Sequence, residues 1–286
     1  MSYPTLKRGD NNDDVKTLQT ALNKVGAMLN ADGDFGAGTQ RGVSYAQDIA
    51  GLPMTGVADS NLWNWLETQP EPFDKLDTNG VAFIAREETG GLDYYQKVTC
   101  WPCYPGEESG ITIGVGYDLR FNTEDNFKST WAPYLPNEYV EELIKDIGEI
   151  GSASRVDELK AKGIEIPFKS AWPVFTNLTL PRFYQETTTI YSSLDVLPKI
   201  CRSVLVSIVF NRGPSLSGDR RKEMKEIQTI LETANDPHLT LEQKKAILKH
   251  VGDQITSMKR LWAPTSGLVG RRDHEAALWE EGLNSW

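Results

Sequence analysis

The chain has 286 residues, is 39% hydrophobic and 24% charged, and carries a formal net charge of −10 at pH 7. This length suffices for one large or two smaller domains, and the composition is that of a globular protein. The acidic balance argues against a nucleic-acid ligand, which demands a basic face, and we find no run of about 18 apolar residues that would span a bilayer. The N-terminus turns acidic at once, so we also expect no signal peptide.

Residues 1–68 are predicted to form a small domain of three helices. Val15, Leu18 and Leu22 have helical spacing, and a second helix is expected to continue through Val43 and Gln47. Turn-rich segments at residues 32–36 (DGDFG) and 55–57 (TGV) separate the helices. A third apolar stretch at residues 62–66 closes the domain.

The stretches LKRGDNNDDVKTLQTAL, DGDFGAGT and LPMTGVAD resemble the three-helix peptidoglycan-binding domain. This resemblance implies bacterial peptidoglycan as the partner, with a groove around the DGxFG loop and the second helix that would involve Phe35, Thr39 and Gln47. The structural alternative places Phe35 in the core and uses Asp32 and Asp34 as turn residues. Residues 69–76, rich in proline and acidic side chains, are expected to be a semi-extended linker, and residues 77–286 a second domain.

The segment Asn79–Leu119 carries the groups suited to acid–base chemistry. Val81, Ile84 and Ala85 give its first part the apolar stripe of a helix, and two glycines at 90 and 91 are expected to end that helix. Glu88 then lies on the last turn. Burial of a carboxyl group at such a position favours its protonated form, which a general acid needs.

The segment ITIGVGYD, residues 111–118, alternates between apolar and small or polar residues, as a strand does. In a straight strand, Thr112 and Asp118 would lie about 20 Å apart. A reversal at Gly114 and Gly116 would instead make them cross-strand partners about 5 Å apart. We therefore predict a hairpin that holds a hydroxyl and a carboxylate side by side.

The arrangement of Glu88 followed by PGEESGITIGVGYDL resembles the phage-type lysozymes, closest to the branch of pesticin-like muramidases. The resemblance implies a lysozyme-like helical fold and a catalytic set of Glu88, Thr112 and Asp118. Other phage lysozymes carry their aspartate before the threonine, and here Glu107 and Glu108 are the acidic residues in that region. They are the alternative second carboxylate.

The remainder is predicted to be mostly helical, so the fold class is mostly α with a small β-hairpin (α+β). Residues 122–136 are expected to be irregular and residues 151–180 are largely unassigned. The helices are expected at 137–150, 154–162, 183–194, 197–210 (buried, because it is apolar nearly all round), 219–233, 240–261 and 268–281.

Three further residues are candidate substrate contacts. Asn211 and Arg212 belong to a stretch, FNRG, that is similar to one in the lysozyme family and would end the buried helix facing a cleft. Arg271 or Arg272, in GLVGRRDHEAALWEEG, resembles a paired arginine of the family's closing helix that would hold a carboxylate. A solvated helix face is the alternative for these arginines.

No motif indicates a metal or a cofactor, and we expect neither. Cys100 and Cys103 form a CxxC in a loop without the context of a redox site, so a loop disulfide or two free thiols is expected. His238, His250 and His274 are scattered without the spacing of a zinc site.

The two resemblances together imply an endolysin that hydrolyses the β-1,4 bond between N-acetylmuramic acid and N-acetylglucosamine. Glu88 would protonate the leaving oxygen, while Asp118 and Thr112 would hold and activate a water. The alternatives are a lytic transglycosylase and a non-catalytic wall-anchoring protein. We expect a monomer that stays in the host cytoplasm until lysis, with a secreted effector or bacteriocin as the alternative.

Overall fold

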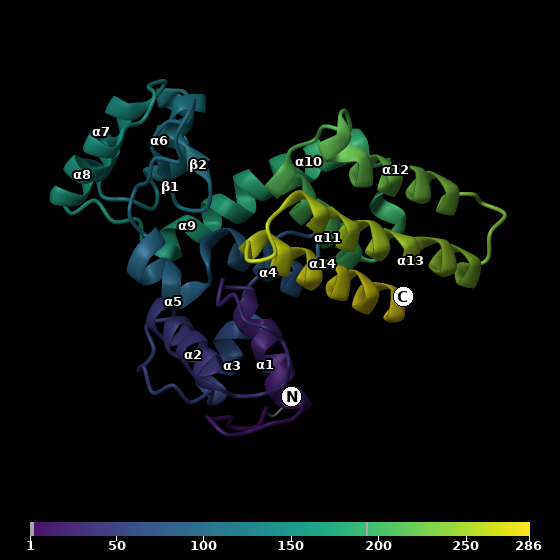
Figure 1. Ribbon diagram of the computed structural model, residues 1–286. Coiled ribbons are helices and arrows are strands. Elements are labelled where there is room, and N and C mark those ends of the chain that lie inside the picture. Colours follow the sequence, from purple (N-terminus) through teal and green to yellow (C-terminus); the bar gives the residue numbers. More distant parts are fainter. Residues whose placement is uncertain (1–2, 193) are drawn as a thin grey trace. The chain divides into compact units, whose positions relative to one another are not determined.

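A computed structural model describes residues 3–192 and 194–286 (Figure 1). The chain divides into two compact units, one of Met1–Pro72 with Ala82–Leu180 and one of Phe73–Val81 with Pro181–Trp286. Both units are mostly helical, and the first contains a two-stranded antiparallel sheet. The predicted fold class is therefore confirmed.

The first unit begins with the three predicted helices, α1 (Asp13–Asn23), α2 (Ala37–Ile49) and α3 (Ser60–Glu67). Side chains cap two of them: Asn12 accepts from the N–H of Val15, and Asp59 accepts from the first turn of α3. Apolar residues from all three helices and their loops form one core. Its buried members are Leu6, Val15, Leu18, Leu22, Val25, Ala27, Phe35, Val43, Ala46, Ala58, Leu62, Trp63 and Leu66.

This three-helix part packs directly on a later helix of the same unit, α9 (Phe168–Val174). The indole N–H of Trp172 donates to the carbonyl of Lys24 at 3.1 Å. A Cβ built on Gly26 would lie 2.7 Å from the ring of Phe168 and 2.8 Å from that of Trp172, so only glycine fits there. Of the predicted linker, residues 69–72 belong to the first unit and 73–76 to the second. The domain limits themselves stay a prediction.

The rest of the first unit is built of short helices around the hairpin. They are the end of α4 (Thr78–Thr89), α5 (Leu92–Tyr94) with a π-helical turn at Tyr95–Thr99, 3-10 turns at Leu119–Phe121 and Ile144–Asp146, α6 (Glu124–Trp131), α7 (Asn137–Leu143), α8 (Ala153–Ala161) and α9 with a π-helical turn at Phe175–Thr179. Pro173 lies inside α9, just before its π-helical turn, where a missing N–H disturbs the helical ladder.

The expectation that residues 122–136 are irregular was wrong, because α6 occupies much of this segment. The side chain of Thr123 caps α6 by accepting from the N–H of Asn126, and two acidic residues follow in the first turn. Phe127 and Trp131, four residues apart, are both fully buried. These signals were present in the sequence but are spread over a single short helix.

The helix predicted at 137–150 ends earlier, at Leu143, and continues only as a 3-10 turn. Gly148, with a φ of 77°, then turns the chain. Ion pairs join this corner to α8: Arg155 binds Asp146 at 2.8 Å and Glu142 at 2.9 Å, and Lys162 binds Glu142 at 2.7 Å. Glu142 of α7 thus accepts hydrogen bonds from Arg155 of α8 and from Lys162, which directly follows α8.

This cluster should make the stability of the first unit depend on pH. Hydrogen bonds from Lys145, Lys162 and Arg155 lower the pKa of Glu142 from 4.5 to about 2. Because the folded-state pKa is depressed, the stabilisation is present above the unfolded pKa and is lost as pH falls from about 4.5 to about 2. Urea denaturation should therefore find Glu142→Gln less stable than the wild type at neutral pH and equally stable near pH 2. If the difference in unfolding free energy between the wild type and Glu142→Gln were the same at neutral pH and near pH 2, the role given to Glu142 would be contradicted.

The second unit consists of α10 (Leu180–Ile190), a 3-10 turn at Leu194–Val196, α11 (Lys199–Arg212), α12 (Lys222–Ala234) preceded by a 3-10 turn at Asp219–Arg221, α13 (Leu241–Ser257) with a 3-10 turn at Met258–Leu261, and α14 (Gly267–Asn284). Helix α13 begins with a capping box between Thr240 and Gln243. Figure 1 shows α12, α13 and α14 as neighbouring helices of this unit.

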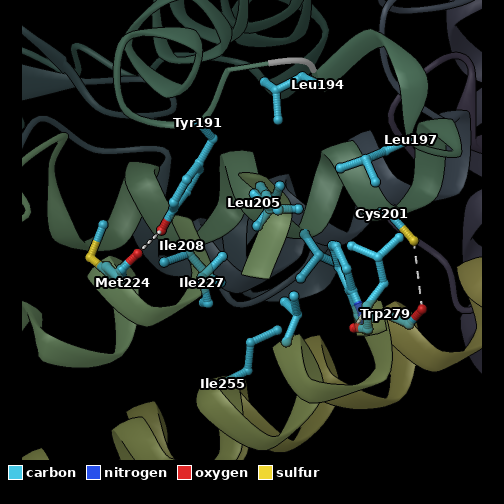
Figure 2. Packing of buried hydrophobic residues seen from close by; sticks show 14 of the residues in the cluster. Tyr191, Leu194, Leu197, Cys201, Leu205, Ile208, Met224, Ile227, Ile255 and Trp279 are labelled. Carbon is cyan, nitrogen blue, oxygen red and sulfur yellow. Dashed lines mark hydrogen bonds between the residues drawn. The ribbon is translucent and has the colours of Figure 1, made fainter. Parts of the chain in front are cut away.

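The buried helix predicted at 197–210 is confirmed as α11. Its apolar side chains fill a core with residues of α12, α13 and α14, as Figure 2 shows. The hydroxyl of Tyr191 donates to the carbonyl of Met224 at 3.3 Å within this core. Helix α14 approaches α11 closely at Gly282, where a Cβ would lie 2.4 Å from Ile200. Among the described residues, no helix is long and apolar enough to cross a membrane.

Candidate functional site

The predicted hairpin is present. Strands β1 (Thr112–Ile113) and β2 (Tyr117–Asp118) pair antiparallel, with Thr112 opposite Asp118 and Ile113 opposite Tyr117. Gly114 and Gly116 have φ values of 59° and 73°, which residues with a side chain rarely adopt. The two glycines therefore allow the three-residue turn. A Cβ on Gly114 would also lie 2.8 Å from the ring of Trp131. The reversal at the two glycines is therefore confirmed.

The two faces of the hairpin differ in chemistry. Ile111, Ile113, Tyr117 and Leu119 are at most 5% exposed and form the apolar face. Thr112 and Asp118 point to the opposite face and are half-buried. The backbone N–H and carbonyl of Thr112 bond to Cys103, so Thr112 and Asp118 are a non-hydrogen-bonded pair with Cα atoms about 4.5 Å apart. Their side chains are thus close neighbours.

The hydroxyl of Thr112 makes no hydrogen bond to any described residue. Its Oγ1 is buried from solvent. A hydroxyl offers one donor and two acceptor sites, and buried polar groups in folded proteins are nearly always bonded. This oxygen therefore has hydrogen-bonding capacity that no described residue uses.

The carboxylate of Asp118 is held by backbone N–H groups. Gly110 donates to both oxygens, at 3.0 and 3.1 Å, and Arg120 donates to Oδ1 at 2.9 Å. These bonds fix the orientation of the carboxylate and join the loop before β1 to the turn after β2. A carboxylate accepts about four hydrogen bonds, so further capacity remains for a ligand.

Gly110 should be required for this clamp. A Cβ at this position would lie 2.6 Å from Asp118 Oδ1 and 2.7 Å from the backbone nitrogen of Arg120, closer than atoms approach without a shift. We expect Gly110→Ala to break the clamp and to destabilise the first unit by about 1–3 kcal/mol, the usual cost of overpacking. Urea denaturation measures this. Gly106→Ala is the control for the substitution itself, since nothing lies within 4 Å of a Cβ there, although its φ of 104° adds backbone strain. A Gly110→Ala protein as stable as the wild type would contradict the clamp.

Glu88 lies one residue before the end of α4, and the glycines after this helix have φ values of 80° and 91°, as helix-ending glycines do. The side chain is half-buried and its Oε1 is shielded from solvent. The structure thus brings Thr112 and Asp118 together on one hairpin and places Glu88 on a separate element of the same unit.

The two alternative carboxylates lie in the loop before the hairpin. Glu107 is exposed and has a φ of 51°, an uncommon conformation for a residue with a side chain. The side chain of Glu108 is 82% exposed and pairs with Arg120 at 2.9 Å. Asp118 is the better oriented of the three, because backbone groups fix its carboxylate.

The three candidate ligand residues of the N-terminal helices all have structural tasks. Phe35 is fully buried in the core, and Thr39 and Gln47 are 3% and 2% exposed. The amide of Gln47 bonds to Thr55, to the N–H of Gly56 and to the carbonyl of Val57. Thr39 donates to the carbonyl of Asp34 at 3.1 Å. These contacts shape the two loops, and ligand binding by the three residues stays a prediction.

In the second unit, Arg271 and Arg272 are buried, so the solvated helix face considered for them is wrong. Arg271 binds Glu275 at 3.2 Å and Arg272 binds the same carboxylate at 2.9 Å. Ser207 of α11 donates to that carboxylate at 2.6 Å. Arg271 does hold a carboxylate, but it is that of Glu275, one turn further along α14. Burial raises the pKa of Glu275, whereas the two guanidinium groups lower it.

Arg212 and Asn211 end α11 next to this cluster. Arg212 is 6% exposed, lies over the ring of Trp262 at 5.2 Å and donates to the carbonyl of Arg220. Burial, with Arg221 and Arg272 adding to it, lowers the pKa of Arg212 to about 10. Asn211 is half-buried and accepts from Arg272 at 3.4 Å. Substrate contact by Asn211, Arg212 and Arg271 stays a prediction.

Sequence reasoning missed Glu275 and Gly110. Glu275 stands three and four residues after the two arginines, which is the spacing of helical ion pairs and would have identified it. Nothing local identifies Gly110, because its partner Asp118 is brought to it by the hairpin.

The three cysteines are free thiols, which settles the choice left open for the CxxC pair. Cys100 is 2% exposed and Cys201 is fully buried, whereas Cys103 is exposed. Among the described residues, no group of three or more histidine, cysteine, aspartate or glutamate side chains is placed to hold a metal ion.

Comparison with known proteins assigns the N-terminal part. Residues 11–66 match the family model described as a putative peptidoglycan binding domain. This range covers α1, α2 and α3. No curated protein matches the chain.

Proposed function

We propose that the chain is a glycoside hydrolase of the muramidase type that cleaves the β-1,4 bond between N-acetylmuramic acid and N-acetylglucosamine in peptidoglycan. The N-terminal helices bind peptidoglycan and bring the wall to the hairpin unit. By its resemblance to phage endolysins, the protein would serve to lyse a host cell from within.

One observation carries this proposal. A half-buried threonine, whose hydroxyl has no described partner, and an oriented carboxylate lie side by side on one face of a hairpin, in the unit that also contains Glu88. Glycoside hydrolysis needs two carboxyl groups, one to protonate the leaving oxygen and one to assist the attack. Glu88 and Asp118 supply the carboxyl groups, and Thr112 supplies a site that positions water.

In the proposed reaction, Glu88 gives its proton to the glycosidic oxygen as the bond from that oxygen to C1 breaks. Charge at C1 grows toward an oxocarbenium ion, which the carboxylate of Asp118 stabilises. A water held by Thr112 forms the new bond to C1 and passes its proton to Asp118. Attack by a positioned water on the opposite face is the inverting route, for which carboxyl groups stand about 6.5–9.5 Å apart, against about 5 Å for a covalent intermediate on Asp118.

The second unit carries its own proposed contacts with the glycan, Asn211, Arg212 and Arg271. Asn211 is the most accessible of the proposed contacts in the second unit, since Arg212 and Arg271 are 6% and 4% exposed. Within the second unit, Arg212 bonds to the carbonyl of Arg220 and Arg271 to Glu275, and these contacts hold the end of α11 and its neighbour α14. Phe35, Thr39 and Gln47 shape the loops of the wall-binding helices in the same way.

The experiment is digestion of purified peptidoglycan by the full chain. We expect the protein to sediment with the wall and to release new reducing ends, which a colorimetric assay counts. Sedimentation without new chain ends would identify a wall-anchoring protein and reject the hydrolase. Clearing of a wall suspension gives a second readout of the same reaction.

A further inference from the structure

Cys103 extends the hairpin by one residue pair. Its N–H donates to the carbonyl of Thr112 at 2.9 Å, and the N–H of Thr112 donates back to its carbonyl at 2.8 Å. The pair forms an antiparallel bridge on the side of β1 that lies opposite β2. Thr112 is therefore the middle of three adjacent backbone positions, with Cys103 and Asp118 as its neighbours.

The three side chains share one face. Residues directly opposite each other in antiparallel segments point the same way, so Cys103, Thr112 and Asp118 form a row. With Cα spacings of about 5.5 Å for the hydrogen-bonded pair and about 4.5 Å for the other, the row is about 10 Å long. It is the accessible face, because Cys103 is exposed while Ile113 and Tyr117 on the opposite face are buried.

Electrostatics supports this placement of the thiol. Loss of hydration around the sulfur raises the pKa of Cys103; Lys160 opposes this effect, and the charge of Asp118 adds to it. The backbone pairing places both side chains in the same row, with Thr112 between them. A protonated thiol at this place is a small, weakly polar surface rather than a nucleophile.

We infer that Cys103 contacts the wall glycan in the proposed site, on the side of Thr112 away from Asp118, and that modification of its thiol blocks that glycan. This inference rests on the proposed function. A polysaccharide is an extended chain, so a segment lying over Thr112 and Asp118 continues past Cys103, their neighbour in the row. The exposed thiol of Cys103 stands on this face beside the half-buried Thr112 and the oriented carboxylate of Asp118.

Thiol chemistry addresses this residue selectively, because Cys100 and Cys201 are 2% and 0% exposed. Burial raises the pKa of the Cys201 thiol to about 12. With methyl methanethiosulfonate, Cys103 gives up its proton to solvent, its sulfur forms a disulfide with the methylthio group, and methanesulfinate leaves. Cys103→Ser is the matched control, which reports any labelling of the two buried cysteines.

The first arm of the test measures protection in the Glu88→Gln protein, so it needs no catalysis. Mass spectrometry follows the labelling rate with and without glycan chains freed of their stem peptides. We expect these chains to slow labelling of Cys103 by about tenfold when present at about ten times their Kd, because bound glycan covers the thiol in all but a tenth of the molecules. Equal rates, with binding of the chains shown separately, would overturn the inference and leave the hydrolase proposal standing.

The second arm measures activity of the wild type before and after labelling. A charged 2-sulfonatoethyl methanethiosulfonate should reduce wall digestion by about tenfold or more, since it adds bulk and a negative charge beside Thr112. Dithiothreitol should restore the activity, and the reagent should not change the activity of Cys103→Ser. A fully modified wild type that digests peptidoglycan at its original rate would overturn the inference.

Discussion

Replacing Glu88 by glutamine should reduce peptidoglycan digestion by about 10³-fold, because general acid catalysis contributes about 10²–10⁴-fold in typical enzymes. Glutamine keeps the shape and hydrogen-bonding capacity of the side chain but cannot deliver a proton to the leaving oxygen. The release of reducing ends per minute, at equal protein concentration, measures the loss. Sedimentation with the wall should stay unchanged, because residues 11–66 carry the wall-binding domain.

Glu87→Gln is the matched control for this variant. The two residues are adjacent on α4 and both are half-buried, so the two substitutions alter the helix and its charge equally. We expect Glu87→Gln to digest the wall within a few-fold of the wild-type rate. Similar losses in both variants, or no loss in Glu88→Gln, would remove Glu88 from the role of general acid.

The largest stability effect is expected at Glu275. Its fully buried carboxylate is shared by Arg271, Arg272 and Ser207. Glu275→Leu has a similar volume but leaves two buried guanidinium groups without that carboxylate, which costs about 3–5 kcal/mol. Urea denaturation should show this as a fall in the free energy of unfolding.

Glu281→Leu, near the end of the same helix, serves as the control because Glu281 is exposed. Exposed substitutions of this kind change the unfolding free energy by no more than about 0.5 kcal/mol in most proteins. If Glu275→Leu were as stable as Glu281→Leu, the buried cluster would not be what holds α14 to α11.

Where local signals decide a structure, the sequence was sufficient. The hairpin follows from the alternation at 111–118 and from two glycines, and the start of α13 follows from Thr240 and its capping partner. The three N-terminal helices follow from apolar spacing and turn residues. Helix α6 could also have been predicted from local signals, because Thr123 is a capping residue and Phe127 and Trp131 have helical spacing.

Features that depend on tertiary contacts were not predictable in this way. From the sequence, Arg271 and Arg272 fitted a carboxylate-holding role and a solvated helix face equally well, because arginine is buried only where a partner such as Glu275 is present. Phe35 and Gln47 belong to the motif that the sequence shares with the peptidoglycan-binding domain. Only the packed structure reveals that Phe35 lies in the core and that Gln47 bonds to the loop at Gly56. The bridge from Cys103 to Thr112 spans a loop of eight residues whose sequence carries no strand pattern.

The most direct measurement is digestion of peptidoglycan in water enriched in ¹⁸O, followed by mass spectrometry of the fragments. If Thr112 and Asp118 deliver water to C1 while Glu88 protonates the leaving oxygen, every new muramic acid end is reducing and carries one ¹⁸O atom. Fragments that end in 1,6-anhydromuramic acid, without the label, would show that the bond is broken without water and would contradict the account.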